Sequence, residues 1–455
     1  MISRDSARHY LGTYWCEQAW LGADRGVMAG VRLSVEGGAL TAVETGVGSV
    51  PPGATRLAGL TLPGIANAHS HVFHRALRGR THGDGGTFWT WRDRMYEAAA
   101  VLDPDGYEAL ATAVFAEMAL AGYTAVGEFH YLHHGPGGTR YTDPNEMGSR
   151  LVAAATRAGL RLTLLDACYL HGGIGRPLAP VQQRFSDGSV NAWAERVGGL
   201  APLAGPTVTV GAAVHSVRAV DPGSIAAVAA WAGEHGAVLH AHVSEQPAEN
   251  EACVAAHGCT PVELLDRCGA VHDRFTAVHA THLTADDIDR LGRATAGCCF
   301  CPTTERDLAD GIGPSTALRD AGARLCIGSD SHAVIDPFEE ARAIELDERL
   351  AALHRGSHRP DQLLDAATRH GYRSLGWAGG ELVVGAVADF VTVDTDNVRL
   401  AGADDVAAAV IFSAAPADVR HVVVDGRVVV ADGRHVAIDV AGALASSITA
   451  VWDVA

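Results

Sequence analysis

The stretch PGIANAHSHVFHR, residues 63–75, follows an apolar run and places His69 and His71 on either side of a single serine. Alternate side chains of an extended strand point to the same face, so these two imidazoles are expected to point the same way. Two ligands of one metal ion must do the same. An H-x-H motif alone also fits capping or core histidines, so a metal site needs further ligands elsewhere in the chain.

The surrounding sequence predicts a barrel. From residue 61 to 332, short apolar runs alternate with alanine-rich stretches of helical period, which is typical of βαβ units around a parallel sheet. Eight runs are expected to form strands, at 62–71, 124–131, 161–171, 207–217, 237–245, 275–282, 297–304 and 324–332. We therefore predict an α/β fold, with a (β/α)8 TIM-like barrel as the catalytic domain over residues 61–379. Its site residues should follow the C-terminal ends of the strands.

Two connections between these strands can be predicted in more detail. Helices are expected over 104–121 and 222–234, because Asp103 and Asp221 precede them as N-caps with proline next in the chain. The stretch GGTFWTW, residues 85–91, is expected to lie in a long loop that covers the mouth of the barrel.

Both ends of the chain have a different pattern. Residues 1–60 and 380–440 consist of strand-like runs separated by turns, and they are expected to form one small β-sandwich domain. The Asp-Gly pairs at 425/426 and 432/433 stand where hairpin turns are expected.

Composition limits the kinds of partner. The chain has 455 residues, 48% of them hydrophobic, and a formal net charge of -18. Such a charge repels nucleic acids and anionic membranes, so neither is expected as a partner, and a small molecule remains. The chain starts without a secretory signal pattern and has no apolar run of about 18 residues. We therefore expect a cytoplasmic protein.

The cysteines of the chain indicate its redox compartment, and the histidines indicate its chemistry. Nine cysteines without regular spacing fit a reducing compartment, and Cys298, Cys299 and Cys301 are expected as small buried side chains of a strand. The 23 histidines are about twice an ordinary share, which indicates metal or proton chemistry.

The polar residues at the predicted strand ends form an ordered series. They are His69 and His71 after the first strand, His242 and Glu245 after the fifth, His279 after the sixth and Asp330 after the eighth. Imidazoles and a carboxylate are ligands that zinc accepts, with one position left open for water.

Three histidines compete for places in that series. His240 shares a face with His242, but His242 lies nearer the mouth and precedes Glu245 by three residues, so we favour it. His282 competes with His279, and His332 accompanies Asp330.

These motifs resemble the amidohydrolase superfamily and, within it, the deiminases that act on N-formimino-L-glutamate. The superfamily resemblance rests on PGIANAHSH, HVSE, VHATH, GSDSH and the tail GAVADFVTVD. The narrower one rests on FWTWRDRMY (88–96) and EFHYLHH (128–134). The resemblance implies that one zinc ion per chain is held by His69, His71, His242 and Asp330. It also implies that Glu245 and His279 handle protons, with Asp330 as a third catalytic residue.

The resemblance also implies a set of substrate contacts. Arg92 and Arg218 would pair with the carboxylates of a small dicarboxylate, Tyr131 would donate a hydrogen bond, and His215 would face the reacting group. The family has glutamine where this chain has His74, whose imidazole can still donate or accept a hydrogen bond. We also expect a homodimer.

The implied reaction is hydrolysis of the C=N bond of N-formimino-L-glutamate to N-formyl-L-glutamate and ammonia, a step of histidine degradation. Zinc would make hydroxide available at neutral pH, and Glu245 would pass a proton to the leaving nitrogen. The alternative is a deaminase of a ring substrate such as guanine or an adenosine derivative. A dicarboxylate needs cations, which Arg92 and Arg218 supply. A scaffold without activity is a third alternative, which the complete ligand series disfavours.

Overall fold

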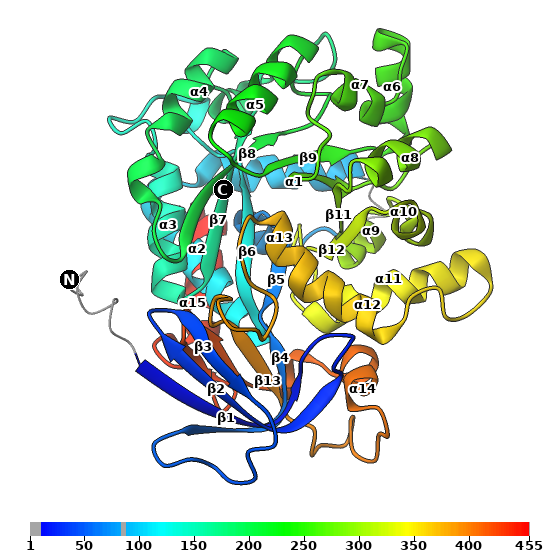
Figure 1. The fold of residues 1–455 in the computed structure, drawn as a ribbon. Coiled ribbons are helices and arrows are strands. Elements are labelled where there is room, and N and C mark those ends of the chain that lie inside the picture. The colour runs from blue at the N-terminus through cyan, green and yellow to red at the C-terminus, as the bar shows by residue number, and fades with distance from the viewer. Residues whose placement is uncertain (1–10, 83–87, 455) are drawn as a thin grey trace.

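The computed structural model describes residues 11–82 and 88–454. Among these residues, eight parallel strands form one sheet in the order β12-β11-β10-β9-β8-β7-β6-β5, and a parallel bridge between Ser70 and Asp330 joins its two edges (Figure 1). The strands are β5 (Ile65–Ser70), β6 (Tyr123–His130), β7 (Arg161–Cys168), β8 (Val208–Val214), β9 (Leu239–Val243), β10 (Phe275–His279), β11 (Gly297–Phe300) and β12 (Arg324–Ile327). All eight predicted strands are confirmed.

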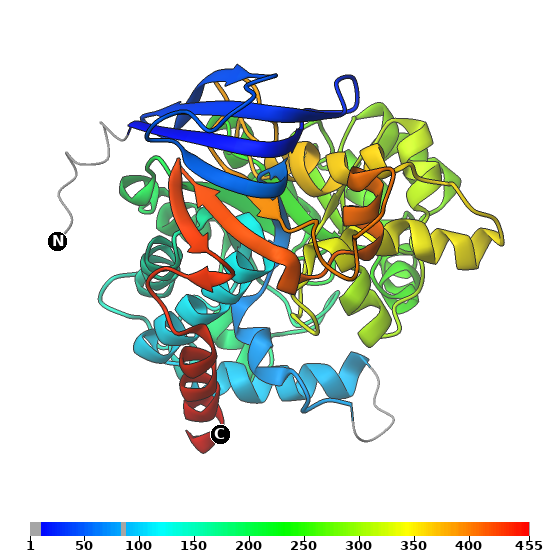
Figure 2. The same cartoon turned by 90° about the horizontal axis from the view of Figure 1, so that it is seen from below.

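Helices connect successive strands and cover the outside of the barrel (Figures 1 and 2). The α-helices are α1 (Phe88–Val101), α2 (Pro104–Ala121), α3 (Glu146–Ala158), α4 (Val190–Gly198), α5 (Pro222–Glu234), α6 (Pro247–His257), α7 (Pro261–Arg267), α8 (Ala285–Arg293), α9 (Pro302–Asp307), α10 (Ser315–Ala321), α11 (Pro337–Ala352), α12 (Pro360–Asp365), α13 (Gly371–Ser374), α14 (Val406–Ser413) and α15 (Val440–Val454). Shorter helical segments are η2 (Val72–Leu77), η3 (Pro136–Gly138), η4 (Pro180–Phe185), η5 (Ala201–Leu203), η6 (Ala366–His370) and η7 (Pro416–Asp418).

The two helix starts predicted from aspartate caps are confirmed. The Asp103 side chain accepts a hydrogen bond from the Gly106 amide at 2.7 Å, and the Asp221 side chain accepts one from the Ser224 amide at 3.1 Å. Each cap satisfies one of the amides that the first helical turn leaves without a partner.

The two chain ends form a second sheet, in the order β16-β15-β14-β13-β4-β1-β2-β3 in the described residues (Figure 2). Its strands are β1 (Leu11–Trp20), β2 (Val27–Glu36), β3 (Ala39–Glu44), β4 (Thr55–Pro63), β13 (Phe390–Val393), β14 (Val419–Val424), β15 (Arg427–Ala431) and β16 (Arg434–His435). The antiparallel pair β4–β13 joins the N-terminal and C-terminal segments. The predicted barrel with a small β domain from both chain ends is confirmed.

Both predicted hairpin turns of this second sheet are present. Asp425 and Gly426 have φ angles of 54° and 76°, and Asp432 and Gly433 have φ angles of 48° and 72°. Positive φ at both central residues matches the tight turn that right-handed strand twist favours.

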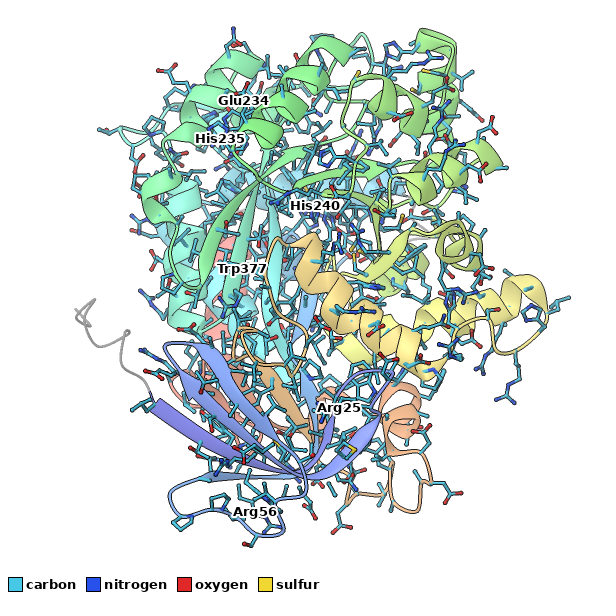
Figure 3. All side chains as sticks on the ribbon, viewed as in Figure 1. Arg25, Arg56, Glu234, His235, His240 and Trp377 are labelled. Atoms are coloured by element: carbon cyan, nitrogen blue, oxygen red, sulfur yellow. The ribbon has the colours of Figure 1, made fainter. Side chains whose placement is uncertain are left out.

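The two sheets are joined at Gly64, between β4 and β5. A Cβ atom at this position would lie 2.5 Å from the Tyr372 hydroxyl and 2.6 Å from Thr124 Oγ1, so the close approach requires glycine. A buried ion pair links the sheets as well, because Arg161 of β7 donates to both carboxylate oxygens of Asp389, at 2.7 and 3.0 Å. The Arg161 guanidinium also lies 4.6 Å from the ring centroid of Trp377, which is labelled in Figure 3.

The connection after η2 differs from the sequence expectation. Residues 83–87 lie outside the described residues, and helix α1 begins at Phe88, so the expected loop over 85–91 is wrong for its last four residues. Apolar residues at helical spacing in FWTWRDRMY explain the earlier start of the helix.

Two other sequence observations can be compared with the structure. Cys298 and Cys299 lie in β11 and Cys301 follows it, and all three are buried free thiols as predicted. None of the helices in residues 11–82 and 88–454 combines the length and the apolar character that a membrane span requires.

Candidate metal-binding active site

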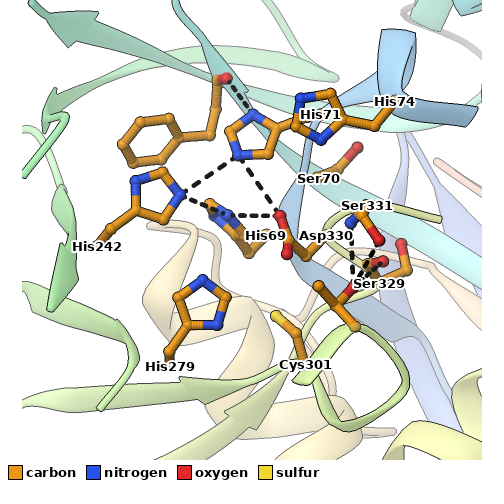
Figure 4. Close-up of polar contacts among 12 residues, drawn as sticks. His69, Ser70, His71, His74, His242, His279, Cys301, Ser329, Asp330 and Ser331 are labelled. Carbon is orange, nitrogen blue, oxygen red and sulfur yellow. Dashed lines mark hydrogen bonds and ion pairs between the residues drawn. The ribbon is translucent and has the colours of Figure 1, made fainter. Parts of the chain in front are cut away.

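Three imidazoles and one carboxylate converge at the C-terminal end of the barrel (Figure 4). His69 lies in β5, His71 follows it, His242 lies in β9 and Asp330 follows β12. His242 Nε2 lies 3.1 Å from His69 Nε2 and 3.3 Å from His71 Nε2. Asp330 Oδ1 lies 3.3 Å from His69 Nε2 and 3.5 Å from His71 Nε2. The structure thus brings together the four residues that the sequence proposed as metal ligands.

Backbone carbonyls fix the orientation of two of these rings. His71 Nδ1 lies 2.9 Å from the Phe129 carbonyl oxygen, and His242 Nδ1 lies 2.8 Å from the His215 carbonyl oxygen. A carbonyl oxygen only accepts, so in each ring Nδ1 carries the proton and Nε2 turns a lone pair toward the centre. Two lone pairs that face each other at 3.3 Å repel, and a cation between them removes the repulsion. The donor set therefore fits a metal ion.

The protonation states also suit a metal ion. Burial lowers the pKa of His71 and of His242 well below the usual value, which favours neutral imidazoles. Burial alone would raise the pKa of Asp330, but contact with His69 outweighs it and holds the pKa well below the usual value. Neutral imidazoles and an ionised carboxylate are the forms that bind metals.

The backbone is strained where the strands end. Ser244, His279 and Asp330 have φ angles of 53°, 67° and 40°, a region that residues other than glycine seldom adopt. Such strain persists only where the surrounding structure holds it, and it tends to gather at functional sites. The strained positions here coincide with the strand ends that carry the polar groups.

The buried side chain of Glu128 holds the H-x-H segment in place through two hydrogen bonds. Glu128 of β6 accepts hydrogen bonds from Ser70 Oγ at 2.6 Å and from the Val72 amide at 2.9 Å. Burial raises the pKa of Glu128 to about 8. The motif EFHYLHH contains Glu128 but does not predict this role, because the partners Ser70 and Val72 lie elsewhere in the chain.

Glu245 and His279 lie beside the ligand cluster. Glu245 Oε1 is 3.7 Å from His279 Nε2, and Glu245 Oε2 is 3.4 Å from an Arg218 nitrogen. Burial lowers the pKa of His279, but the nearby Glu245, Glu305 and Asp330 outweigh burial and raise it to about 10. The pair therefore combines a carboxylate with an imidazole at the edge of one cavity.

That cavity has a volume of about 370 Å³ and opens at the C-terminal end of the strands. Its lining includes Glu245, His279, all the predicted metal ligands except His69, and the predicted substrate contacts His74, Arg92, Tyr131, His215 and Arg218. His69 is fully buried behind the others. The structure thus places the predicted substrate contacts around one cavity with the candidate metal centre.

The substrate contacts have partners of their own. His74 Nε2 lies 2.9 Å from the Tyr131 hydroxyl, and burial lowers the pKa of His74 to about 3, which favours the neutral ring. The Arg92 guanidinium lies 5.5 Å from the Tyr96 ring centroid. His215 Nδ1 lies 3.2 Å from Ser216 Oγ.

The three competing histidines have other partners. His240, labelled in Figure 3, points deeper into the barrel, where its Nε2 donates to the Ser374 carbonyl at 2.9 Å. His282 Nε2 donates to the Asp310 carbonyl at 2.7 Å. His332 lies 3.2 Å from Ser70 Oγ and 3.0 Å from Ser329 Oγ. The structure therefore gives all three hydrogen-bonding roles around the centre.

Sequence reasoning missed several residues of the cavity wall. Glu249, Tyr96 and Tyr169 line the cavity. Glu249 Oε2 lies 3.0 Å from Arg218 Nε. Gln182, which does not belong to the described lining, donates to the hydroxyls of Tyr96 at 3.0 Å and Tyr169 at 2.8 Å. Glu249 lies in helix α6 but Glu245 precedes that helix, so their spacing of four residues carries no helical signal for the shared contact with Arg218.

An eight-stranded parallel barrel with three histidines and an aspartate gathered at the ends of its strands has the donor set of a metal-dependent barrel enzyme. Residues 60–429 match the Amidohydrolase family, and the chain belongs to that family.

Individual proteins that are similar to this chain give more detail than the family match. The chain is 42% identical over 397 residues to a formimidoylglutamate deiminase from Pseudomonas aeruginosa, covering 84% of this chain and 87% of that protein. It is 30% identical over 363 residues to an 8-oxoguanine deaminase from the same organism, covering 78% and 79% of the two chains. The crystal structure of an amidohydrolase from Brucella melitensis superposes with a TM-score of 0.89 at 33% identity, covering 97% of this chain and 100% of that one.

Proposed function

We propose that this protein hydrolyses the C=N bond of N-formimino-L-glutamate, giving N-formyl-L-glutamate and ammonia. The observation that carries the proposal is the 42% identity with the Pseudomonas aeruginosa deiminase across most of both chains. The cavity supports it, because it joins a metal-type donor set to Arg92 and Arg218. A small substrate with two carboxylates needs such cations.

The metal that we propose is one zinc ion per chain, held by His69, His71, His242 and Asp330. Three neutral imidazoles and a carboxylate suit zinc, and their ligand atoms lie within 4.8 Å of one another. When bound, zinc would supply activated water at neutral pH. The residues of the chain must then orient the substrate and move protons.

Glu245 is proposed as the group that moves the proton. It lies in the cavity wall beside His279, and its carboxylate can take a proton from the attacking water and give it to the leaving nitrogen. In its protonated form, His279 beside Glu245 would stabilise the negative charge that develops during attack. Asp330 would accept a hydrogen bond from the attacking water.

Arg218 and Arg92 are proposed to bind the two carboxylates of the substrate. Arg218 already lies 3.4 Å from Glu245 and 3.0 Å from Glu249, so a substrate carboxylate would share this arginine with two protein carboxylates. Tyr131 and His74 form one hydrogen-bonded pair in the cavity lining, and they would contact the substrate together with His215.

A ring deaminase is the less well supported function. One relative of that kind, the 8-oxoguanine deaminase, shares 30% identity, against 42% for the formimidoylglutamate deiminase. The arginines of the cavity lining, Arg92 and Arg218 among them, also suit a dicarboxylate better than a neutral ring.

The test measures zinc content and ammonia release from N-formimino-L-glutamate, with N-formimino-L-aspartate and guanine as controls. We expect about one zinc per chain and the highest kcat/KM on N-formimino-L-glutamate. Arg218→Gln should weaken use of the dicarboxylate, whereas Arg157→Gln, a surface change, should leave it unaltered. Activity on guanine alone would overturn the proposal. The expected homodimer is a separate proposal, which light scattering of the pure protein tests.

A further inference from the structure

A second buried glutamate lies behind His279, on the side away from the cavity. Glu305, in the first turn of helix α9, places Oε1 3.4 Å from His279 Nδ1. The same oxygen accepts a hydrogen bond from the Cys301 amide at 2.8 Å. Glu305 and His279 are both buried, with exposed fractions of 5% and 1%.

His279 therefore lies between two carboxylates. Its Nε2 faces Glu245 Oε1 at 3.7 Å, and its Nδ1 faces Glu305 Oε1 at 3.4 Å. Among the described residues, the cavity lining includes Glu245 and His279 but does not include Glu305. Glu305 thus lies outside the cavity lining, and its side chain contacts that lining at His279.

These hydrogen bonds indicate which nitrogen of the His279 imidazole carries a proton and which nitrogen faces the cavity. An oxygen that accepts from the Cys301 amide behaves as a carboxylate acceptor, so the proton between it and the imidazole belongs to His279 Nδ1. Nε2 is then the nitrogen presented to the cavity. The negative charge of Glu305 also balances positive charge on the ring, and carboxylates behind histidines act in this way in other active sites.

We propose that Glu305 is a positioning residue that keeps His279 protonated at Nδ1, with Nε2 directed at the reacting groups. This role in turnover rests on the function proposed above for His279. The buried contact itself does not depend on the identity of the substrate.

The first test is Glu305→Gln, which keeps the shape of the side chain and removes its charge. We expect kcat to fall about 10- to 100-fold, with KM within about twofold of the original and zinc content unchanged, as for other groups that orient a site residue. The matched control is Glu340→Gln. Glu340 is fully buried on the neighbouring helix α11 and accepts from the Thr303 amide at 3.1 Å, so its replacement tests the loss of a buried charge near α9.

The control should keep its kcat within about threefold. An unchanged kcat in Glu305→Gln, or an equal loss in both variants, would overturn the proposal.

The second test needs neither a variant of Glu305 nor a substrate. Long-range 1H–15N spectra of the zinc-loaded protein with 15N-labelled histidine report which ring nitrogens carry protons, and His279→Gln identifies the signals of His279. We expect a protonated Nδ1, and an unprotonated Nδ1 would overturn the proposal. Absence of activity on N-formimino-L-glutamate would instead count against the proposed function alone.

Discussion

Within the described residues, the barrel holds two buried groups that combine histidines with an aspartate. The two groups differ in what neutralises the negative charge of the aspartate. At the candidate metal centre, Asp330 faces the rings of His69 and His71. In the second group, His130, His133 and Asp166 also place ligand atoms within 4.8 Å of one another. There, however, Arg196 donates to both oxygens of Asp166, each at 2.7 Å.

The difference shows why residue types alone do not define a metal site. In the second group the guanidinium supplies the positive charge, and Trp193 donates a further hydrogen bond to Asp166 at 3.0 Å. His133 Nε2 donates to the Ala167 carbonyl at 2.9 Å, which uses the nitrogen that lies nearest Asp166. A cation added to this group would meet Arg196 and would be repelled. We therefore expect a metal at the first group and a structural role for the second.

The largest expected effect comes from removing a ligand of the first group. His71→Ala should lose zinc and lower activity by more than about a hundredfold, since even an outer partner of a ligand changes affinity or activity about 10- to 100-fold. His133→Ala is the control from the second group and should keep both zinc and activity. Metal analysis with the ammonia assay measures both. Loss of zinc in His133→Ala, with zinc kept in His71→Ala, would mean that the second group binds the metal and the first does not.

Glu245→Gln should separate metal binding from turnover. Loss of the proton-moving carboxylate should lower kcat about 10²- to 10⁴-fold while zinc stays bound. The same metal analysis and assay apply. Loss of zinc in this variant would mean that Glu245 is a ligand.

Arg196→Met should lower the free energy of unfolding and leave the zinc content of the folded protein unchanged. It leaves the buried carboxylate of Asp166 without its cation, and breaking such a pair costs about 3–5 kcal/mol of unfolding free energy. Arg157→Met removes a surface ion pair in which the side chain of Arg157 itself is 61% exposed. This change should lower the unfolding free energy by less than about 1 kcal/mol. Denaturant titration of both variants measures the difference. Equal losses would show that Arg196 does not neutralise a buried charge.

Metal removal should destabilise the protein through the first group alone. At free zinc about a hundredfold above its Kd, binding contributes about 2.7 kcal/mol to stability, and a chelator removes it. The melting temperature should therefore fall on chelation in the unaltered protein and stay constant in His71→Ala. A fall of the same size in His71→Ala would place the stabilising metal elsewhere.

The smallest expected effect is the pH response of the second group. Burial, reinforced by the charge of Arg196, lowers the pKa of His133 to about 4, whereas an unfolded histidine titrates near 6.5. The unfolded chain then binds more protons between these values, so this histidine lowers stability as pH falls from about 6.5 to 4.

His133→Gln should make the loss of stability over that interval shallower. His354→Gln, at an exposed position, should leave it unchanged, as followed by denaturant titration at several pH values. A slope that is the same in both variants would mean that His133 titrates normally.

The sequence predicted the barrel and its candidate ligands because both depend on local order along the chain. Strand ends of a parallel barrel meet at one rim, so strand order places His69, His71, His242, Glu245, His279 and Asp330 together. The choice of His69, His71, His242 and Asp330 as the ligands comes from the resemblance to the amidohydrolase superfamily. The choice between His240 and His242 was harder, because alternate residues share a face and differ only in depth.

Other features depend on contacts that strand order does not reveal. The roles of Glu128 and Glu305 come from partners on neighbouring segments, Ser70 and His279. The expectation of a loop over 85–91 rests on its place in a long connection that begins with Gly85 and Gly86, and it misses the start of helix α1 at Phe88.

Anomalous diffraction at the zinc edge tests the central comparison most directly, with crystals grown in the presence of zinc. We predict one strong peak about 2.0–2.2 Å from His69, His71, His242 and Asp330, and no peak at His130, His133 and Asp166. Zinc at the second group, or an empty first group in a protein that binds zinc elsewhere, would contradict the account.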